Sequence, residues 1–248
     1  MSLRDRENGI LEYLRQTREA SIDELCDKFF VSVATMRRDL TALSKSGKII
    51  RTHGGAFLSS TPGESIPQEL REKEFVLEKE IIAKKCLELI KDGDSVMIDG
   101  SSTCLQLMKI LDAKKSIVVI TNSTKAPFVS QKTGVKTFVS GGEVSKNSFS
   151  YVGSVAEESI RKFNADICFF SVCSLSPDGI LSNNSTSENQ LCRVMLEQAK
   201  KSVLLLNSQK TKEPKKLNTL CSIKDIDFIV SEKDISNEFP EYKKKFIC

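Results

Sequence analysis

The fold of this chain is decided by residues 21–56, SIDELCDKFFVSVATMRRDLTALSKSGKIIRTHGGA. Ser21 is a suitable N-cap, because its hydroxyl can accept a hydrogen bond from a backbone N–H of the first helical turn. Ile22, Leu25 and Phe29 then recur at the spacing of one helix face. The start of the stretch therefore predicts a short amphipathic helix.

A second helix of the same stretch follows a short turn at Phe30–Val31. Ser32 is its N-cap, the helix runs to about Ser46, and Gly47 ends it, since glycine readily adopts the conformation that closes a helix. An earlier helix is predicted at Asn8–Gln16, where apolar residues also repeat at helical spacing. Two helices joined by a tight turn, with a third before them, are typical of a helix-turn-helix domain.

The helix after Ser32 has an apolar face and a cationic face. At about 100° per residue, the residues that face the core are Val33, Met36, Leu40 and Leu43. Arg38 points nearly the opposite way, beside Arg37 and the small residues Ala34 and Thr35. Small side chains allow close approach to base edges, and arginines can bind guanine edges or phosphates. Asp39 lies toward the protein, where it could orient an arginine or be a plain surface charge.

A basic hairpin follows this helix. Residues 48–51 are predicted to form a strand, and Gly54 and Gly55 a turn. Arg51 and His53 are then placed to contact phosphate or the minor groove, as the wing of a winged helix does. The candidate DNA-binding residues are Ser32, Ala34, Thr35, Arg37, Arg38, Arg51, His53, Gly54 and Gly55. The alternative is a three-helix protein-binding domain with a solvated arginine face, and the basic hairpin favours DNA.

The composition is that of an ordinary soluble protein. The 248 residues are 40% hydrophobic and 28% charged, with a net charge of +4. Because this charge is mild, any DNA contact must come from local charge placement. No apolar run approaches the roughly 18 residues of a membrane span, and the charged N-terminal residues are unlike a signal peptide. The sequence therefore predicts a cytoplasmic protein with no membrane partner.

Cysteine usage indicates neither a disulfide framework nor a metal site. The eight cysteines form no CxxC pair, and the chain has one histidine. Zinc ligands cluster at short spacings that are absent here, so we expect no metal and no cofactor. In a reducing compartment the thiols are interpreted as small, mostly buried hydrophobes. They are Cys26, Cys86, Cys104, Cys168, Cys173, Cys192, Cys221 and Cys248.

The pattern changes after residues 59–63, which are small, polar and rich in helix breakers, as a linker is. A helix at 74–90 comes next, followed by short apolar runs that alternate with amphipathic segments. The predicted strands are Ser95–Ile98, Ile117–Thr121, Thr137–Val139, Ile167–Val172, Val203–Leu206 and Phe228–Val230. The predicted helices between them are Ser102–Leu111, Lys125–Lys132, Val155–Lys162 and Glu188–Lys201. Such alternation indicates a parallel, Rossmann-like α/β sheet covered by helices on both faces.

These patterns divide the chain into predicted domains: a winged helix-turn-helix at 1–58, a linker at 59–73 and an α/β domain at 74–248. Lys243–Lys245, near the end of the chain, is predicted to be solvated.

Polar loops follow three of the predicted strands. In the first, Gly100 allows a tight turn, and the hydroxyls of Ser101, Ser102 and Thr103 with free helix-start amides suit a phosphate. The other two loops are Thr121-Asn122-Ser123 and Gly141-Gly142-Glu143. Each loop alone could be an ordinary cap or turn. Because ligands of open α/β sheets bind at the carboxyl ends of strands, the three together indicate a small-molecule site.

These residues resemble the signature of the DeoR family of bacterial transcriptional regulators. The matching positions are Thr35, Arg37-Arg38-Asp39-Leu40, Leu43, Gly47, Arg51 and His53-Gly54-Gly55-Ala56. The resemblance implies an N-terminal winged helix-turn-helix domain and a C-terminal sensor domain similar to sugar-phosphate isomerases. It continues beyond the first domain, which distinguishes it from a bare helix-turn-helix match.

The family's sensor pattern corresponds to five segments of this chain. They are Asp99–Thr103, Thr121-Asn122, Gly141-Gly142-Glu143, Glu188 and Lys210. The resemblance implies a phosphorylated sugar or similar metabolite, with its phosphate on Ser101–Thr103. The residues implied to contact its hydroxyls or phosphate are Asp99, Asn122, Glu143 and Lys210. The chain departs from the family at Val172–Leu175, where a glycine-rich turn is usual, and at Asn207-Ser208-Gln209-Lys210, where relatives often have an aspartate before the lysine.

Two functions are compatible with these features. The first is a transcription factor, most simply a repressor of a sugar-catabolism operon, whose effector and operator favour different arrangements of the assembly. Symmetric operators need paired reading heads, so we expect a homodimer or homotetramer on double-stranded operator DNA. The alternative is a sugar-phosphate isomerase with an accessory DNA-binding domain, in which Asp99 or Glu143 is the general base. The sequence also leaves open an activator, because the sign of regulation depends on operator position, and a regulator that needs no effector.

Overall fold

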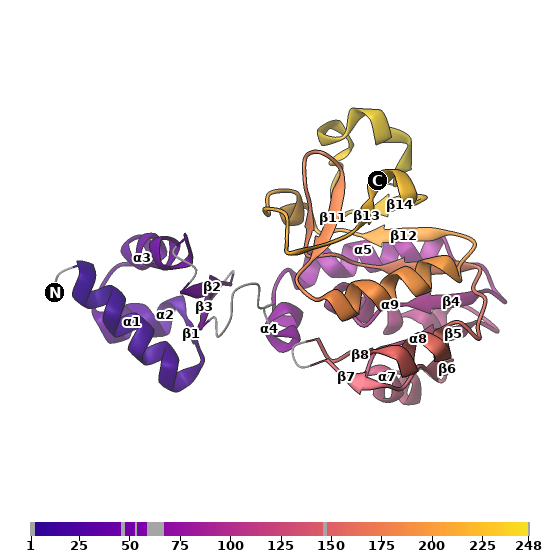
Figure 1. Cartoon of the computed structure of the whole chain (residues 1–248), viewed down its shortest axis with the longest axis horizontal. Helices are drawn as coiled ribbons and strands as arrows, with labels where there is room; N and C mark the ends of the chain where they lie inside the picture. The colour runs from indigo at the N-terminus through magenta and orange to yellow at the C-terminus, as the bar shows by residue number, and fades with distance from the viewer. Residues whose placement is uncertain (1–2, 46–47, 53, 59–66, 146–147, 248) are drawn as a thin grey trace. The chain divides into compact units, whose positions relative to one another are not determined.

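The computed structural model describes residues 3–45, 48–52, 54–58, 67–145 and 148–247. The chain divides into two compact units, Met1–Glu74 and Phe75–Cys248. Figure 1 shows the elements of each unit. Within the described ranges, no helix combines the length and the apolar character needed to traverse a bilayer.

The first unit is a winged helix-turn-helix. Its helices are α1 (Leu3–Thr17), α2 (Ile22–Phe29) and α3 (Val33–Lys45). Its strands are β1 (Glu19–Ser21), β2 (Ile49–Arg51) and β3 (Gly55–Leu58), paired antiparallel in the order β1-β3-β2. The predicted helices and hairpin are confirmed. Helix α1 starts before Asn8, and the prediction began too late because the first turns are polar and show no apolar repeat. The sequence missed β1, since three residues are too few to show alternation.

Side-chain caps fix where α2 and α3 begin. The Ser21 hydroxyl accepts a hydrogen bond from the Glu24 N–H (3.0 Å), and the Ser21 N–H donates to the Glu24 carboxylate (3.3 Å). This reciprocal pair is a capping box. The Ser32 hydroxyl likewise accepts from the Thr35 N–H (3.3 Å). Both predicted N-caps are therefore confirmed.

One apolar core holds the first unit together. From α3 it receives Met36, Leu40 and Leu43, each at most 1% exposed. Val33 was predicted to join them, but it is 39% exposed. The prediction was wrong because Val33 is the first residue of α3, and neighbouring elements cover a side chain less at a helix end. Gly47, the predicted end of this helix, lies outside the described residues.

Part of the predicted linker is helical. Helix α4 (Gln68–Lys73) lies within residues 59–73, of which 59–66 are outside the described ranges. Six mostly charged residues show no apolar stripe, so periodicity could not reveal this helix. The second unit begins with α5 (Val76–Glu88), close to the helix predicted at 74–90.

The second unit is built on a seven-stranded parallel sheet with the order β15-β14-β12-β9-β4-β5-β6. Its strands are β4 (Ser95–Ile98), β5 (Val118–Thr121), β6 (Lys136–Val139), β9 (Ile167–Phe170), β12 (Ser202–Leu205), β14 (Phe228–Val230) and β15 (Phe246–Ile247). The chain winds outward from β4 to β6, and then from β9 to β15 on the other side. Winding therefore reverses between β4 and β9, as in a Rossmann-like sheet.

Helices cover both faces of this sheet (Figure 1). They are α5, α6 (Ser102–Met108), α7 (Ala126–Thr133), α8 (Ser154–Ile160) and α9 (Thr186–Glu197). Helices α5, α6 and α7 share a core with Val96 and Ile98 of β4, whereas α8 and α9 share a core with Met97. Because successive strand residues point to opposite faces, both sets must be apolar. This arrangement explains the continuous apolar runs in the sequence.

Short antiparallel strands complete the unit. They are β7 (Glu143–Val144) and β8 (Tyr151–Val152), which form a hairpin, and β10 (Ser174–Leu175), β11 (Ile180–Asn183) and β13 (Asn218–Ser222), which form a small sheet. Most are too short to show a periodic pattern, so the sequence did not predict them. Lys243 and Lys244 are exposed, as predicted for a solvated end, and they lie in a 3-10 helix that leads into β15. Lys245 is half-buried. Lys245 Nζ donates a 2.8 Å hydrogen bond to the carbonyl oxygen of Lys224.

The described cysteines are all free. Four are buried, namely Cys86, Cys104, Cys168 and Cys192, and three are half-buried, namely Cys26, Cys173 and Cys221. Burial raises the pKa of each buried thiol, because a thiolate would lose its hydration. Burial also raises the pKa of Cys221 to about 12. The four buried thiols and that of Cys221 thus stay protonated at neutral pH. The four buried cysteines pack as small hydrophobes, and Cys248 lies outside the described residues.

Candidate functional site

Helix α3 turns its two arginines outward. Arg37 and Arg38 are exposed, and neither guanidinium makes a hydrogen bond or ion pair with the described residues. Ala34 is exposed one turn before Arg38, and the half-buried Thr35 has its hydroxyl 3.1 Å from Ser32 Oγ. This face of α3 therefore combines small residues with two free cations, which is the surface needed for close contact with a DNA groove.

Asp39, between these arginines and the core, faces the protein as predicted. Its carboxylate forms an ion pair with Arg6 of α1, and the two side chains are 0% and 11% exposed. The hydrogen bond from Arg6 to Asp39 raises the pKa of the guanidinium. The arginine that Asp39 orients is thus Arg6, and the pair ties α3 to α1 rather than positioning Arg37 or Arg38.

The wing is joined to α3 through Thr41. Arg51 Nη1 donates a 2.8 Å hydrogen bond to Thr41 Oγ1, and this hydroxyl donates to the carbonyl oxygen of Arg37 at 2.6 Å. Gly55 lies where a Cβ atom would be 2.0 Å from the carbonyl oxygen of Ala20, so no larger residue fits between β1 and β3. Gly54 is exposed, and the predicted contact residue His53 lies outside the described residues.

Asp99 follows β4, next to the point where the winding of the sheet reverses. Its Oδ1 accepts a hydrogen bond from the Ser101 N–H (2.9 Å), and its Oδ2 accepts one from the Ser171 N–H (2.8 Å). Ser171 follows β9, so this carboxylate fastens together the loops on both sides of the reversal. Ligands of doubly wound sheets bind at this point.

Lys210 extends this connection to β12. Its Nζ donates a 2.8 Å hydrogen bond to Ser171 Oγ, which donates to the carbonyl oxygen of Leu205 at 2.7 Å. The ends of β4, β9 and β12 are therefore linked through Asp99, Ser171 and Lys210. Ser171, which sequence reasoning missed, lies between the two candidate residues Asp99 and Lys210 and is hydrogen-bonded to both.

The loop at residues 100–103 leads from β4 into α6. The Ser101 hydroxyl caps α6 by accepting from the Cys104 N–H (3.3 Å), while Ser102 and Thr103 are buried. At Gly100 a Cβ atom would lie only 2.1 Å from Ser150 Oγ and 3.5 Å from Asn122 Oδ1. Gly100 is therefore the place where the loops after β4 and β5 meet the segment that precedes and opens β8.

That segment, residues 148–151, is called the serine elbow here. It is hydrogen-bonded to the loop after β5: the Tyr151 N–H donates to the Asn122 carbonyl oxygen (2.7 Å), and Asn122 Nδ2 donates to the Tyr151 carbonyl oxygen (3.1 Å). Phe149 has a φ of 45°, and its carbonyl oxygen accepts from both the N–H and the hydroxyl of Thr124. Thr121 is also buried there, and its hydroxyl accepts from the Ser123 N–H (3.1 Å).

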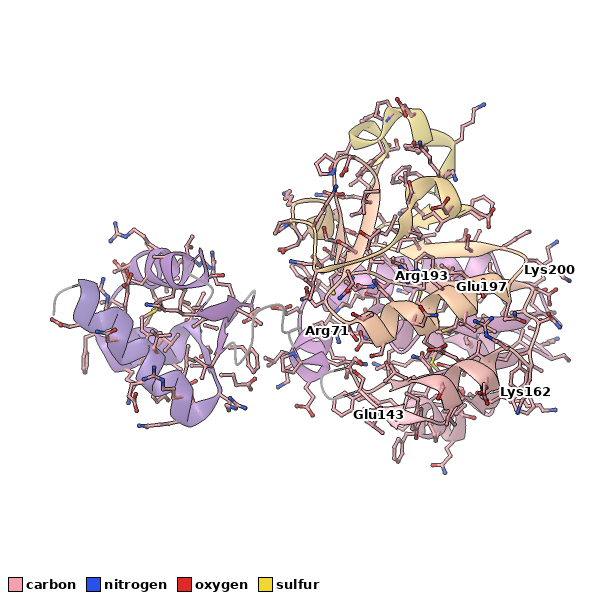
Figure 2. The ribbon with its side chains drawn as sticks, in the orientation of Figure 1. Arg71, Glu143, Lys162, Arg193, Glu197 and Lys200 are labelled. Carbon is pink, nitrogen blue, oxygen red and sulfur yellow. The ribbon has the colours of Figure 1, made fainter. Side chains whose placement is uncertain are left out.

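The predicted loop at residues 141–143 shapes the β7–β8 hairpin. Gly141 and Gly142 have φ values of 66° and 113°, and a Cβ atom at Gly142 would lie 2.8 Å from the Val152 carbonyl oxygen. Glu143 is an exposed residue of β7 (Figure 2). Glu188, in the first turn of α9, accepts a 2.8 Å hydrogen bond from the hydroxyl of Ser145, just after β7.

Buried polar atoms without partners gather at this edge of the sheet. In the described part of the second unit they are Thr103 Oγ1, Asn122 Oδ1, Ser148 Oγ, Asn207 Nδ2 and Ser208 Oγ. The Asn207 amide is oriented by the Gln209 N–H, which donates to its Oδ1 (2.9 Å), so the free atom is the Nδ2 donor. Buried polar groups normally find hydrogen-bond partners, so these free atoms are candidates for contacts with a ligand.

Three of these residues were missed by sequence reasoning. Asn207 and Ser208 come directly after β12, so the rule that selected the other strand ends could have found them. Ser148 gave no such signal, because it precedes a two-residue strand that no pattern reveals.

The first unit is a winged helix-turn-helix with free arginines, and the second is a doubly wound sheet with polar groups at its strand ends. Together they define a DNA-binding transcriptional regulator with a sensor domain. Residues 6–61 match the DeoR-like helix-turn-helix domain, and residues 74–233 match the DeoR C-terminal sensor domain. The chain belongs to the DeoR family. The expected fold class is confirmed as a winged helix-turn-helix followed by a Rossmann-like α/β domain. The expected likeness of this second domain to sugar-phosphate isomerases stays a prediction.

Named relatives align over most of the chain. The transcriptional repressor AccR of Agrobacterium fabrum is 30% identical over 252 residues, 99% of this chain and 97% of that protein. The glycerol-3-phosphate regulon repressor of Escherichia coli is 29% identical over 211 residues, 85% of this chain and 83% of that protein. A solved D-ribose-5-phosphate isomerase in complex with phospho-erythronic acid is 15% identical, covers 54% of this chain and 52% of its own, and has a TM-score of 0.41.

Proposed function

We propose that this regulator represses genes of sugar catabolism and is released from its operator by a phosphorylated sugar. The observation that carries the proposal is the outward α3 face, where Arg37 and Arg38 have no partner among the described residues. Its other contacts to DNA would come from Ser32, Ala34, Thr35, Arg51, His53, Gly54 and Gly55. The names of the two repressors that align over most of the chain support the sign of regulation.

The proposed effector site is the strand-end cluster of the second unit. The phosphate would lie on Gly100, Ser101, Ser102 and Thr103, where the Thr103 hydroxyl is buried and free to donate. The sugar hydroxyls would contact Thr121, Asn122, Glu188 and Lys210, and also Ser148 of the serine elbow. Gly141, Gly142 and Glu143 would act by shaping the hairpin beside Glu188, and Asp99 by holding the loops together.

We propose binding without turnover at this site. Both carboxylate oxygens of Asp99 accept backbone N–H groups, which gives this side chain a structural role between two loops and leaves it fewer lone pairs for taking a proton from a substrate. Glu143 is exposed on β7, and the one histidine of the chain is in the wing sequence. These features favour a sensor over an isomerase.

Release of DNA would follow from linkage. An effector weakens DNA binding if it binds better to an arrangement that fits the operator poorly. Two reading heads on a symmetric operator require at least a homodimer, and a homotetramer would also satisfy this need. We propose residues 1–58 as the DNA-binding domain, 59–73 as the connection, 74–248 as the sensor, and the cytoplasm as the location.

The test uses purified full-length protein and labelled duplexes from the intergenic regions beside its gene. Fluorescence anisotropy is measured with glycerol 3-phosphate, ribose 5-phosphate or hexose phosphates, and with the unphosphorylated sugar as the matched control. We expect nanomolar, salt-dependent binding to one duplex that a phosphorylated sugar alone weakens. Binding that no phosphorylated sugar changes would overturn the effector proposal, and isomerisation of any of them would overturn binding without turnover.

A further inference from the structure

Phe30, in the turn between α2 and α3, is both strained and exposed. It caps α2 with φ 52° and ψ 48°, the left-handed region in which Cβ crowds the backbone. Its side chain is 93% exposed, so burial returns none of this cost. Glycine or asparagine would make the same backbone more favourable. An aromatic residue kept in such a conformation is a feature of functional sites.

Val33 continues this apolar surface onto α3. It is 39% exposed, and the next residue, Ala34, is exposed as well. Residues four apart share a helix face, so Val33 lies on the side of Arg37, and Ala34 on the side of Arg38. The apolar surface of Phe30, Val33 and Ala34 thus borders the two free arginines.

Charge selects the occupant of this surface. A protein partner with an apolar patch would have to bury two guanidinium groups without counter-ions, which is costly. A second copy of the same face would bring like charges together. Duplex DNA instead supplies phosphates and guanine edges for Arg37 and Arg38, and in the major groove it offers one apolar group, the C5-methyl of thymine.

We propose that Val33 contacts a thymine methyl group in each half-site, and that Phe30 packs at the outer edge of this contact and excludes water from it. The inference rests on the proposed binding of operator DNA and adds the base preference. Val33, which the sequence assigned to the core, is on this account a specificity-determining residue.

The first test isolates the methyl group. Duplexes are selected from a random library with the full-length protein, and each thymine of the selected site is replaced in turn by deoxyuridine. At one thymine per half-site, we expect the loss of the methyl to weaken binding about fourfold, the effect of removing one buried methyl group. Val33→Ala should bind the thymine site about as weakly and should not respond to deoxyuridine at that position.

Val155→Ala replaces an exposed valine of α8 and is the matched control. It should leave the affinity for both the thymine and the deoxyuridine duplex unchanged. If the losses of binding free energy caused by Val33→Ala and by the thymine replacement were additive, the proposed contact would be overturned. Failure to enrich any duplex would instead overturn DNA binding itself, so the two failures are distinguishable.

Phe30→Gly separates folding from recognition. Glycine relieves the left-handed backbone, so the melting temperature should stay the same or rise while affinity for the selected duplex falls severalfold. Wild-type affinity in this variant would overturn the role of Phe30. A loss of self-association in sedimentation, with DNA affinity unchanged, would assign the surface to a contact between copies instead.

Discussion

Arg51 of the wing and Thr41 of α3 are joined by a 2.8 Å hydrogen bond from Nη1 to Oγ1. The same hydroxyl donates to the carbonyl oxygen of Arg37, so one side chain connects the wing to the turn of α3 that carries the outward arginines. The wing and helix α3, which carries the candidate DNA-contacting arginines, are therefore held together as one surface.

Replacing Thr41 by valine removes this connection and keeps the shape of the side chain. We expect operator affinity to fall about threefold, because an exposed hydrogen bond of this kind contributes on the order of 0.5–1 kcal/mol. Fluorescence anisotropy checks the loss, and Thr41→Ser, which keeps the hydroxyl, should restore binding. Full affinity in the valine variant would show that Arg51 holds its position without Thr41.

Arg38→Ala should weaken operator binding by about 1–3 kcal/mol if the arginine reads a base, with little change in thermal stability because the side chain has no partner among the described residues. Arg161→Ala, which removes an exposed arginine of the second unit, is the charge-matched control. A footprint identical to that of the wild type would remove Arg38 from the reading face.

Arg6→Met leaves the buried Asp39 carboxylate without its counter-ion. We expect the free energy of unfolding of the first unit to fall by about 2 kcal/mol, because an uncompensated buried charge is unfavourable. Arg15→Met is the control: Arg15 pairs with Glu12 at the surface, with both side chains more than half exposed, and should cost less than about 0.5 kcal/mol. Equal losses in urea titrations of the two variants would show that burial of the Arg6–Asp39 pair has no special effect.

Thr103→Val and Ser148→Ala remove hydroxyls that have no partner in the protein. Stability should therefore be unchanged or slightly higher, while the effector concentration needed to release DNA should rise about tenfold, the effect of one lost hydrogen bond to a charged ligand. Thr121→Val is the comparison, since its hydroxyl accepts from the Ser123 N–H and its loss should lower the melting temperature. An unaltered effector response in both variants would place the ligand elsewhere.

Asp166 predicts a pH dependence of stability. Hydrogen bonds from Lys200 (Figure 2) and from Ser95 hold the pKa of this carboxyl well below its usual value. A folded-state pKa below the unfolded value of about 3.9 stabilises the protein above that pH, and the contribution is lost as the pH falls through the folded pKa. In urea unfolding, Asp166→Asn should be less stable than wild type at pH 6, and the difference should shrink below about pH 4. A difference that is independent of pH would assign the effect to packing.

The reading helix could be predicted from sequence because its signals are local. Ser21 and Ser32 cap helices by contacting residues three positions ahead, and the spacing of Met36, Leu40 and Leu43 alone fixes which side faces the core. The parallel sheet was also predictable, because strands buried on both faces must be continuously apolar. Proposing the polar loops after the strands as a candidate site needed only the rule that the carboxyl ends of strands in such sheets meet at one edge.

Contacts between distant residues were decided by tertiary structure. No spacing reveals that Asp39 pairs with Arg6, that Asp99 joins the loops after β4 and β9, or that Gly100 must stay small because Ser150 lies against it. Val33 is a case in which local periodicity gave the wrong answer. Its spacing predicted a core position, but at the start of α3 it is left exposed. The sequence by itself determined which faces are apolar and where polar loops follow strands, since both depend on neighbours along the chain. Which polar groups pair, and which remain free for DNA or a ligand, depends on segments that only folding brings together.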